Sequence, residues 1–310
     1  GAFLSCCSTA VSLDVGAKLK DIFQYPLVGS EDNVLDKFCR GCCITLIKGT
    51  GTRALHTGDV AIAIKNAFHD YCKEHRFKFY DQDYKLNLFG VRNPTNASGL
   101  FDDNLVALWK EPGGWRAEVY ICTTDPGTAW LKRAGPSGQG TAILVPDQYV
   151  DSWDVDKHAG RYRALCQTPG RNVKVWRDKN KDDKLDFSGP VDVGVFGINI
   201  HHGGVPNARK FMTRSLSQED MVRRYSAGCQ VIANVEDFAV FMKRVDKAAS
   251  AGHGKYYTYT LLEESQGPFM ARVSSYLGED SPAPAPPPRR VRGAGGRVGP
   301  GGSAPHNKAD

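Results

Sequence analysis

The sequence predicts a mainly β chain of the α+β class, built as a β-sandwich or barrel with one late helix. Seven strand-like runs separated by turn residues lie between residues 80 and 202. A single helix with clear end signals follows after residue 233, and the run YYTYTLLEE then supplies a last strand. We expect these elements to form one domain over residues 80–265.

Residues 13–79 show helical spacing in place of strand alternation. The segments LDVGAKLKDIF, EDNVLDKFC and TGDVAIAIKNAFHDYCKEH each read as a short helix. In the third, Val60, Ile64, Phe68 and Tyr71 fall on one face, which is the pattern of an amphipathic helix. We therefore predict a small helical module over 13–79, preceded by an N-terminal tail at 1–12.

The β region is read from apolar runs with turn signals between them. Pro112, Gly113 and Gly114 separate two runs and predict a hairpin. Short connections of this kind favour an antiparallel meander. The runs are YKLNLFGVR, NLVALWKE, WRAEVYICTT, GTAILVP, RYRALCQ, NVKVWRD and VGVFGINIHH.

The late helix has signals at both ends. Asn234 suits the N-cap, and Glu236 and Asp237 place negative charge at the positive end of the helix dipole. Gly252 and Gly254 predict its end. The apolar face consists of Phe238, Phe241, Met242 and Val245.

The net charge of +6 comes mostly from the end of the chain. Residues 281–310 hold five Lys and Arg residues against one Asp, together with many prolines and glycines. Such a composition cannot bury a core, so we predict a disordered tail over 266–310. The rest of the chain is near neutral, which argues against a nucleic-acid partner, and no apolar run is long enough to span a membrane.

One cysteine stands in a setting that suits a nucleophile. The chain has nine cysteines, so at least one thiol is free of internal pairing. Cys229 follows Ser226, Ala227 and Gly228, whose flexible backbone can bring N–H groups together beside the sulfur. A base is also required, and His201 and His202 end the apolar strand upstream. The alternative is that Cys229 is a buried core thiol.

These segments, in this order, resemble the YkuD-type L,D-transpeptidase catalytic domain of bacterial cell-wall enzymes. The likeness runs from about residue 118 to residue 262 and is carried by Thr-Thr-Asp-Pro-Gly at 123–127, Ile-His-His-Gly-Gly at 200–204 and Ser-Ala-Gly-Cys at 226–229. Two features depart from the family: Ala227 stands where the family has His, and the 24 residues between His201 and Ser226 form a longer spacing than usual.

The resemblance implies acyl transfer on peptidoglycan stem peptides by a transpeptidase or a carboxy- or endopeptidase. Cys229 would be the nucleophile and His201 the base, the latter preferred over His202 because it shares a strand face with Asn199 and Gly203. The N–H groups of Ala227, Gly228 and Cys229 would bind the oxyanion, and Ser226 would orient His201 or the loop. His202, Gly203 and Thr124 would contact substrate.

The resemblance further implies no required cofactor and a place in the cell envelope, a secreted fraction or a phage particle. No complete signal peptide is visible at the start of the sequence.

An acidic segment has the oxygen spacing of a calcium loop. Asp178, Asn180, Asp182 and Asp186 occupy positions 1, 3, 5 and 9 of such a loop, whereas Gly189 replaces its bidentate Glu. A structural calcium ion and a solvated charged turn are both consistent with this pattern.

Two other functions compete with the acyltransferase. One is a catalytically inactive relative that binds cell wall, which the missing His at position 227 favours. The other is a metallopeptidase using His201 or His202 with a carboxylate such as Asp192, although no His-Glu-x-x-His motif is present.

Overall fold

A computed structural model describes residues 53–93, 98–204, 222–263 and 266–278. The predicted N-terminal tail, the first two predicted helices of the 13–79 module and most of the predicted C-terminal tail lie outside the described residues.

Eight strands form a closed barrel, so the prediction of a mainly β chain is confirmed in its barrel form. They run in the order β4-β11-β10-β7-β6-β12-β2-β3, and β3 pairs back with β4. All pairings in the ring are antiparallel except β10–β11 and β12–β2. The strands are β2 (Asn87–Val91), β3 (Asp103–Glu111), β4 (Gly114–Thr123), β6 (Asp147–His158), β7 (Tyr162–Gln167), β10 (Ile200–His202), β11 (Gln230–Ile232) and β12 (Tyr257–Leu261).

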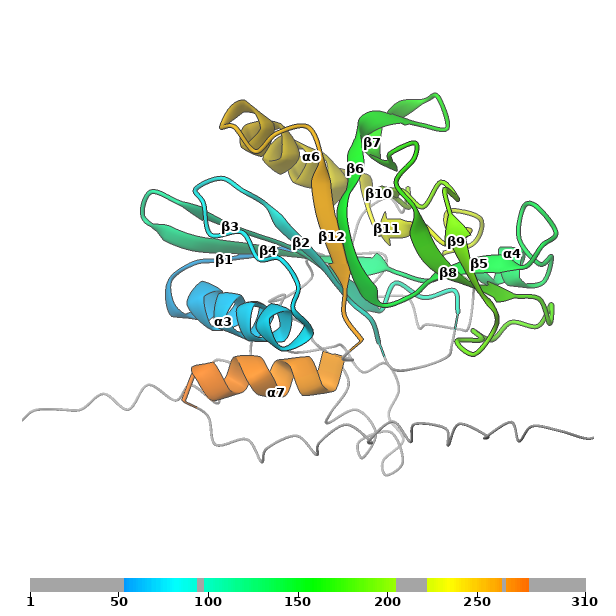
Figure 1. Ribbon diagram of the computed structural model, residues 1–310, viewed down its shortest axis with the longest axis horizontal. Helices are drawn as coiled ribbons and strands as arrows, with labels where there is room; N and C mark the ends of the chain where they lie inside the picture. The colour runs from blue at the N-terminus through cyan, green and yellow to red at the C-terminus, as the bar shows by residue number, and fades with distance from the viewer. Residues whose placement is uncertain (1–52, 94–97, 205–221, 264–265, 279–310) are drawn as a thin grey trace, which may run out of the picture.

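Four further strands complete the described sheets. β1 (Arg53–His56) adds to the edge of β4. A separate sheet has the order β5-β8-β9, formed by Thr141–Leu144, Val173–Asp178 and Val191–Gly194. Figure 1 shows this sheet beside the barrel, next to β10 and β11.

The described residues contain four helices, α3 (Gly58–His75), α4 (Thr128–Leu131), α6 (Val235–Ser250) and α7 (Gln266–Tyr276). In Figure 1, α3 and α7 lie next to each other on one side of the barrel, and α6 lies on the opposite side. α6 confirms the predicted late helix, because the Asn234 side chain accepts a hydrogen bond of 2.7 Å from the Asp237 N–H.

Two apolar cores explain this arrangement. Leu105, Ala107 and Trp109 of β3 point into the barrel core with the apolar face of α6, whereas Val106 and Leu108 point outward. Because alternate residues of one strand serve two cores, β3 is buried along most of its length. The sequence accordingly shows a continuous apolar run in place of polar alternation.

The outer core joins both flanking helices to the barrel. The Phe68 ring on α3 stacks on Phe89 of β2 at 3.9 Å between centroids and lies 4.3 Å from Phe269 of α7. The last helix predicted for the 13–79 module is present as α3, and it packs on the barrel through this core. At the other end, residues 266–276 form α7 where the sequence predicts the start of the tail, and α7 buries Phe269 and Val273 in the same core.

Two strand assignments differ from the sequence prediction. The run at 193–202 divides into β9 and β10, with Gly197 at a φ of +72° between them. β6 was not predicted. The hairpin at Pro112 to Gly114 is confirmed, since Glu111 pairs with Gly114 across the turn.

Candidate active site

The candidate nucleophile and base lie on neighbouring parallel strands. His201 on β10 is paired with Val231 on β11, and Cys229 directly precedes β11. Because side chains alternate along a strand, Cys229 and Val231 share a face, and both belong to one buried cluster. The structure thus places Cys229 and His201 on the same face, two residues apart in register.

A short turn fixes the backbone before Cys229. The Ser226 hydroxyl donates to the Cys229 carbonyl at 2.9 Å and accepts from the Gly228 N–H at 3.2 Å. Gly228 has a φ of +122°, and a Cβ there would lie 2.4 Å from the Ala142 carbonyl oxygen. Only glycine fits this position without strain.

The turn changes two of the predicted roles. Ser226 orients the loop, which is one of its two predicted roles, and its hydroxyl bonds to the loop backbone and not to His201. The Gly228 N–H is already occupied by Ser226, so it does not supply an oxyanion donor in this conformation. Among the described residues, the N–H groups of Ala227 and Cys229 form no turn or loop hydrogen bond, so they remain the candidate oxyanion donors.

The Cys229 thiol sits in a backbone cradle. Its sulfur accepts from the Asn199 N–H at 3.4 Å, and the thiol donates to the Gly197 carbonyl at 3.4 Å. The residue is only 9% exposed, and this burial raises the pKa of the thiol to about 11, although the Asn199 N–H opposes the shift. Cys229 is therefore a neutral thiol at pH 7.

Gln167 at the end of β7 holds the cradle in shape. Its side-chain oxygen accepts from three successive backbone N–H groups, those of Phe196, Gly197 and Ile198, at 3.0 to 3.1 Å. These residues lead directly into Asn199. One amide side chain thereby fixes the segment that contacts the sulfur.

His201 is held in the tautomer that a base needs. Its Nδ1 lies 2.9 Å from the His202 carbonyl, which only accepts, so Nδ1 carries the proton and Nε2 the lone pair. Nε2 forms no well-aligned hydrogen bond with a described residue, although the Tyr225 backbone lies close enough to the ring to oppose the fall in the pKa of His201. Burial, followed by the neighbouring His158, lowers the pKa of His201 to about 3, so the ring is neutral.

No hydrogen bond joins the thiol to either histidine among the described residues. Nδ1 of His201 also lies 3.3 Å from the Tyr162 hydroxyl, and the His202 ring stacks on the Tyr162 ring at 4.3 Å between centroids. Both histidines therefore contact Tyr162. Strand alternation assigns His201, which pairs with Val231, to the face that Cys229 would share.

Two side chains around His201 were not predicted. The His158 ring at the end of β6 stacks on His201 at 4.1 Å between centroids. The Asn199 amide nitrogen lies 2.9 Å from His158 Nδ1, and its oxygen accepts from the Gln167 N–H at 2.9 Å. Asn199 thus contacts the sulfur through its backbone and His158 through its side chain. Only its position two residues before His201 pointed to it in the sequence.

Two residues predicted to contact substrate are part of the internal structure. Thr124 is fully buried, and its hydroxyl donates to the Asp103 carboxylate at 2.8 Å. Gly203 allows close packing, because a Cβ there would lie 2.7 Å from the Phe101 ring. The predicted substrate contacts by Thr124 and Gly203 are therefore not available in this conformation. His202 is half-buried beside Tyr162.

A cavity of about 480 Å³ opens beside the turn that leads to Cys229. It is lined by Ala129 and by Arg223, Arg224 and Tyr225. Both arginines are exposed, and Tyr225 directly precedes Ser226. The cavity therefore joins two positive charges to the segment that carries the thiol.

The acidic segment at 178–186 forms a turn whose side chains bind its own backbone. Asp178 accepts from the Asp186 N–H at 3.0 Å, Asn180 from the Asp182 N–H at 3.2 Å, and Asp182 from the Lys184 N–H at 2.8 Å. Within the described ranges, no three His, Cys, Asp or Glu side chains are grouped so that they could hold a metal ion. Calcium binding at this turn stays a prediction.

The metallopeptidase set is not brought together. Strand alternation assigns His201 and His202 to opposite sides of β10, and Asp192 in the smaller sheet is paired with Arg177 at 3.0 Å.

Comparison with protein-family models found no match, and neither curated proteins nor solved structures matched the chain. Among the described helices, none combines the length and apolar character needed to cross a membrane.

Proposed function

We propose that the chain is a cysteine-dependent acyltransferase or peptidase that acts on peptidoglycan stem peptides, similar to YkuD-type L,D-transpeptidases. The observation that carries the proposal is the cradled Cys229 thiol just before β11, two positions in register from His201 on the neighbouring strand β10. The His202 carbonyl holds the Nδ1 proton and leaves Nε2 to accept another. This is the orientation that general-base catalysis requires.

The reaction follows from these groups. The Cys229 sulfur attacks the carbonyl carbon of a stem-peptide residue as its proton passes to His201 Nε2. The oxyanion that forms accepts hydrogen bonds from the N–H groups of Ala227 and Cys229. Collapse breaks the C–N bond, and the leaving amine takes the proton from His201. An amine or water then cleaves the thioester and restores the thiol, which gives a transpeptidase or a hydrolase respectively.

The protonation states shape the first step. The thiol pKa of about 11 and the His201 pKa of about 3 both favour the neutral pair over a thiolate and imidazolium. Proton transfer therefore accompanies attack on the substrate. It also requires the thiol to leave the Gly197 carbonyl, to which it donates in the resting structure.

The arginines that line the cavity favour a substrate that carries negative charge. Stem peptides carry free carboxylates, and a guanidinium binds a carboxylate through two parallel hydrogen bonds. Arg224 lies five residues before Cys229 and lines the cavity beside the turn. We expect Arg224→Gln to raise KM for a carboxylated peptide with little change in kcat. We propose that a protein acting on this substrate is found in the cell envelope, a secreted fraction or a phage particle.

A second function is favoured by the buried state of the sulfur. A catalytically inactive relative would bind the same peptides and keep Cys229 as a core thiol with its raised pKa.

Intact-protein mass spectrometry with a carbapenem separates the two functions. The active enzyme forms a covalent adduct that Cys229→Ala abolishes. Cys166→Ala is the matched control, because Cys166 is a neighbouring thiol with the same exposed fraction of 9%, and it should keep the adduct. Wild-type protein that binds stem peptide but forms no adduct and turns over no peptide would support the inactive relative.

A further inference from the structure

A second cavity lies at the opposite end of the barrel strand that reaches the candidate active site. It has a volume of about 350 Å³ and opens between α3, the segment after it and the β3–β4 hairpin. Trp115 near the start of β4 lines it, whereas Thr123 at the end of β4 pairs with β11. Eight residues of extended strand span roughly 26 Å, so the cavity is separate from the Cys229 site.

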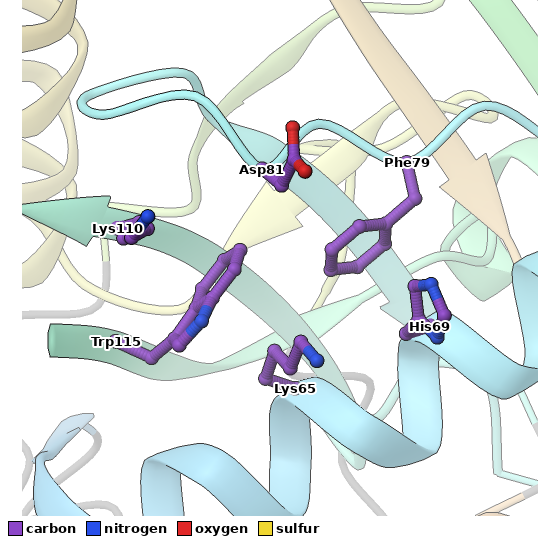
Figure 2. Close-up of a pocket in the computed structure, with 6 residues that line it drawn as sticks. All are labelled: Lys65, His69, Phe79, Asp81, Lys110 and Trp115. Atoms are coloured by element: carbon purple, nitrogen blue, oxygen red, sulfur yellow. The ribbon is translucent and has the colours of Figure 1, made fainter.

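One wall of the cavity is aromatic. The Phe79 and Trp115 rings are 5.7 Å apart between centroids at an angle of 43°, and the edge of His69 meets Phe79 at 5.2 Å. Figure 2 shows the Phe79 and Trp115 side chains together in the middle of the cavity. Both rings pack against the outer core and are half-buried, so each keeps part of its surface exposed beside the cavity.

The rim is polar and carries both signs of charge. The Lys65 ammonium lies 5.8 Å from the Trp115 centroid and gives one hydrogen bond to Asn66 at 3.1 Å, which leaves two of its three hydrogens. Asp81 is exposed and forms no hydrogen bond or ion pair with any described residue. Lys110 is exposed and lies 3.8 Å from Asp83. Figure 2 shows Lys65, Asp81 and Lys110 on different sides of the two rings.

We propose that this cavity binds a pyranose ring of an oligosaccharide. A pyranose presents C–H groups on its face, which pack on an aromatic ring, and hydroxyl groups on its edge, which both donate and accept. The rim matches that edge, since Lys65 donates and Asp81 accepts.

Other ligand classes fit less well. An apolar ligand would desolvate the charges of Lys65 and Asp81 without compensation. A phosphate group would meet the Asp81 carboxylate. The volume lies at the lower end of the range for ligand sites, which suits one or two sugar rings.

The site stands independently of the acyl-transfer proposal. Together the two would let the chain hold a glycan at one end of β4 and act on an attached peptide at the other. Failure of either leaves the other intact, because Cys229→Ala should not alter saccharide binding and Trp115→Ala should not alter the carbapenem adduct.

The test is titration of the full chain with chitotriose, followed by calorimetry and tryptophan fluorescence. We expect saturable binding that weakens at least about tenfold, or 1.4 kcal/mol, in Trp115→Ala. Asp81→Asn should also weaken binding, and this exposed position tests the rim without disturbing the core. Tyr256→Ala, which removes an exposed aromatic elsewhere, should bind as wild type does.

Three results would overturn the proposal. They are no saturable binding of chitotriose, equal binding by Trp115→Ala and wild type, or equal loss in Tyr256→Ala and Trp115→Ala. Circular dichroism of each variant establishes that a loss of binding is not a loss of fold.

Discussion

The imidazole of His158 stacks on the imidazole of His201 at 4.1 Å between ring centroids and 21° between planes. The two rings come from β6 and β10, which are not neighbours in the barrel, because β7 lies between them. Two histidines this close do not readily share positive charge, so His158 is a cause, after burial, of the lowered pKa of His201. The stack therefore favours a base that begins the reaction neutral.

Replacing His158 with Phe keeps a flat ring and removes its charge. We expect His158→Phe to raise the pKa of His201 above about 3 while leaving it below the ordinary 6.5, because burial is the larger cause. An NMR titration of the histidine rings measures this. His69→Phe at the far cavity is the control and should leave His201 unchanged. A His201 pKa that stays the same or falls in His158→Phe would contradict the role given to the stack.

The turn before Cys229 should tolerate no side chain at Gly228. A Cβ there meets the Ala142 carbonyl at 2.4 Å in a backbone conformation with a φ of +122°. We expect Gly228→Ala to reduce the free energy of unfolding by more than about 3 kcal/mol. Gly138→Ala is the matched control, since Gly138 also has a positive φ of +70° but nothing within 4 Å. It should cost about 1 to 2 kcal/mol. Equal losses of unfolding free energy in the two variants, measured by urea unfolding, would show that the turn adjusts to accommodate a side chain at position 228.

His253 makes the fold sensitive to acid. Its Nδ1 accepts from the Leu86 N–H at 2.9 Å, and burial, followed by Lys85, lowers its pKa to about 4. The unfolded chain takes up a proton on this residue below pH 6.5, whereas the folded chain does so only near pH 4. This residue's contribution to stability is therefore present above pH 6.5 and falls toward pH 4, with a limiting slope of about 1.4 kcal/mol per pH unit.

Comparison with His253→Asn isolates this contribution from that of the buried carboxyl groups, whose raised pKa values act in the opposite sense. The advantage of wild type over the variant, measured by urea unfolding at pH 7 and pH 4.5, should be smaller at the lower pH. An advantage that is constant or grows at pH 4.5 would show that His253 does not titrate in this way.

Asp178 contains a buried carboxylate oxygen that has no hydrogen-bond partner among the described residues. Burial, helped by the Asp182 and Asp186 carboxylates, raises the pKa of Asp178, so its charged form destabilises the fold as pH rises above 3.8. We expect Asp178→Asn to raise the free energy of unfolding by about 1 kcal/mol at pH 7 in a chelator. Calcium should stabilise wild type more than the variant. A variant that is less stable in the chelator would contradict this account of Asp178.

Local signals in the sequence predict the elements that carry them. The α6 helix has an N-cap and an apolar face, and β3 and β4 are long apolar runs with a hairpin turn. β6 has a burial pattern interrupted by Asp147, Asp151, Asp154 and Asp156, so its strand character depends on partners on both sides. α7 buries only Phe269 and Val273 in the core, and its first turn contains Gly267 and Pro268. Its sequence therefore resembles the Gly- and Pro-rich tail that follows.

Barrel closure and the surroundings of the site depend on distant partners. β12 pairs in parallel with β2, far back in the sequence, and no local pattern specifies that pairing. Cys229 and His201 are predictable from the sequence, because a small flexible segment precedes the cysteine and an apolar strand ends at the histidine. His158 and Tyr162 reach His201 only because β6 and β7 form a hairpin, and the sequence pattern does not predict β6. The hydrogen bond of the Gly228 N–H to Ser226 likewise depends on the folded turn.

The central claim is that the Cys229 thiol performs chemistry on stem peptides. Mass spectrometry of purified muropeptides, incubated with wild type, Cys229→Ala and Cys166→Ala, tests it most directly. We predict that wild type and Cys166→Ala yield the same cleaved or cross-linked products and that Cys229→Ala yields none while remaining folded. Products that persist in Cys229→Ala, or that are missing from the wild-type reaction, would contradict the claim.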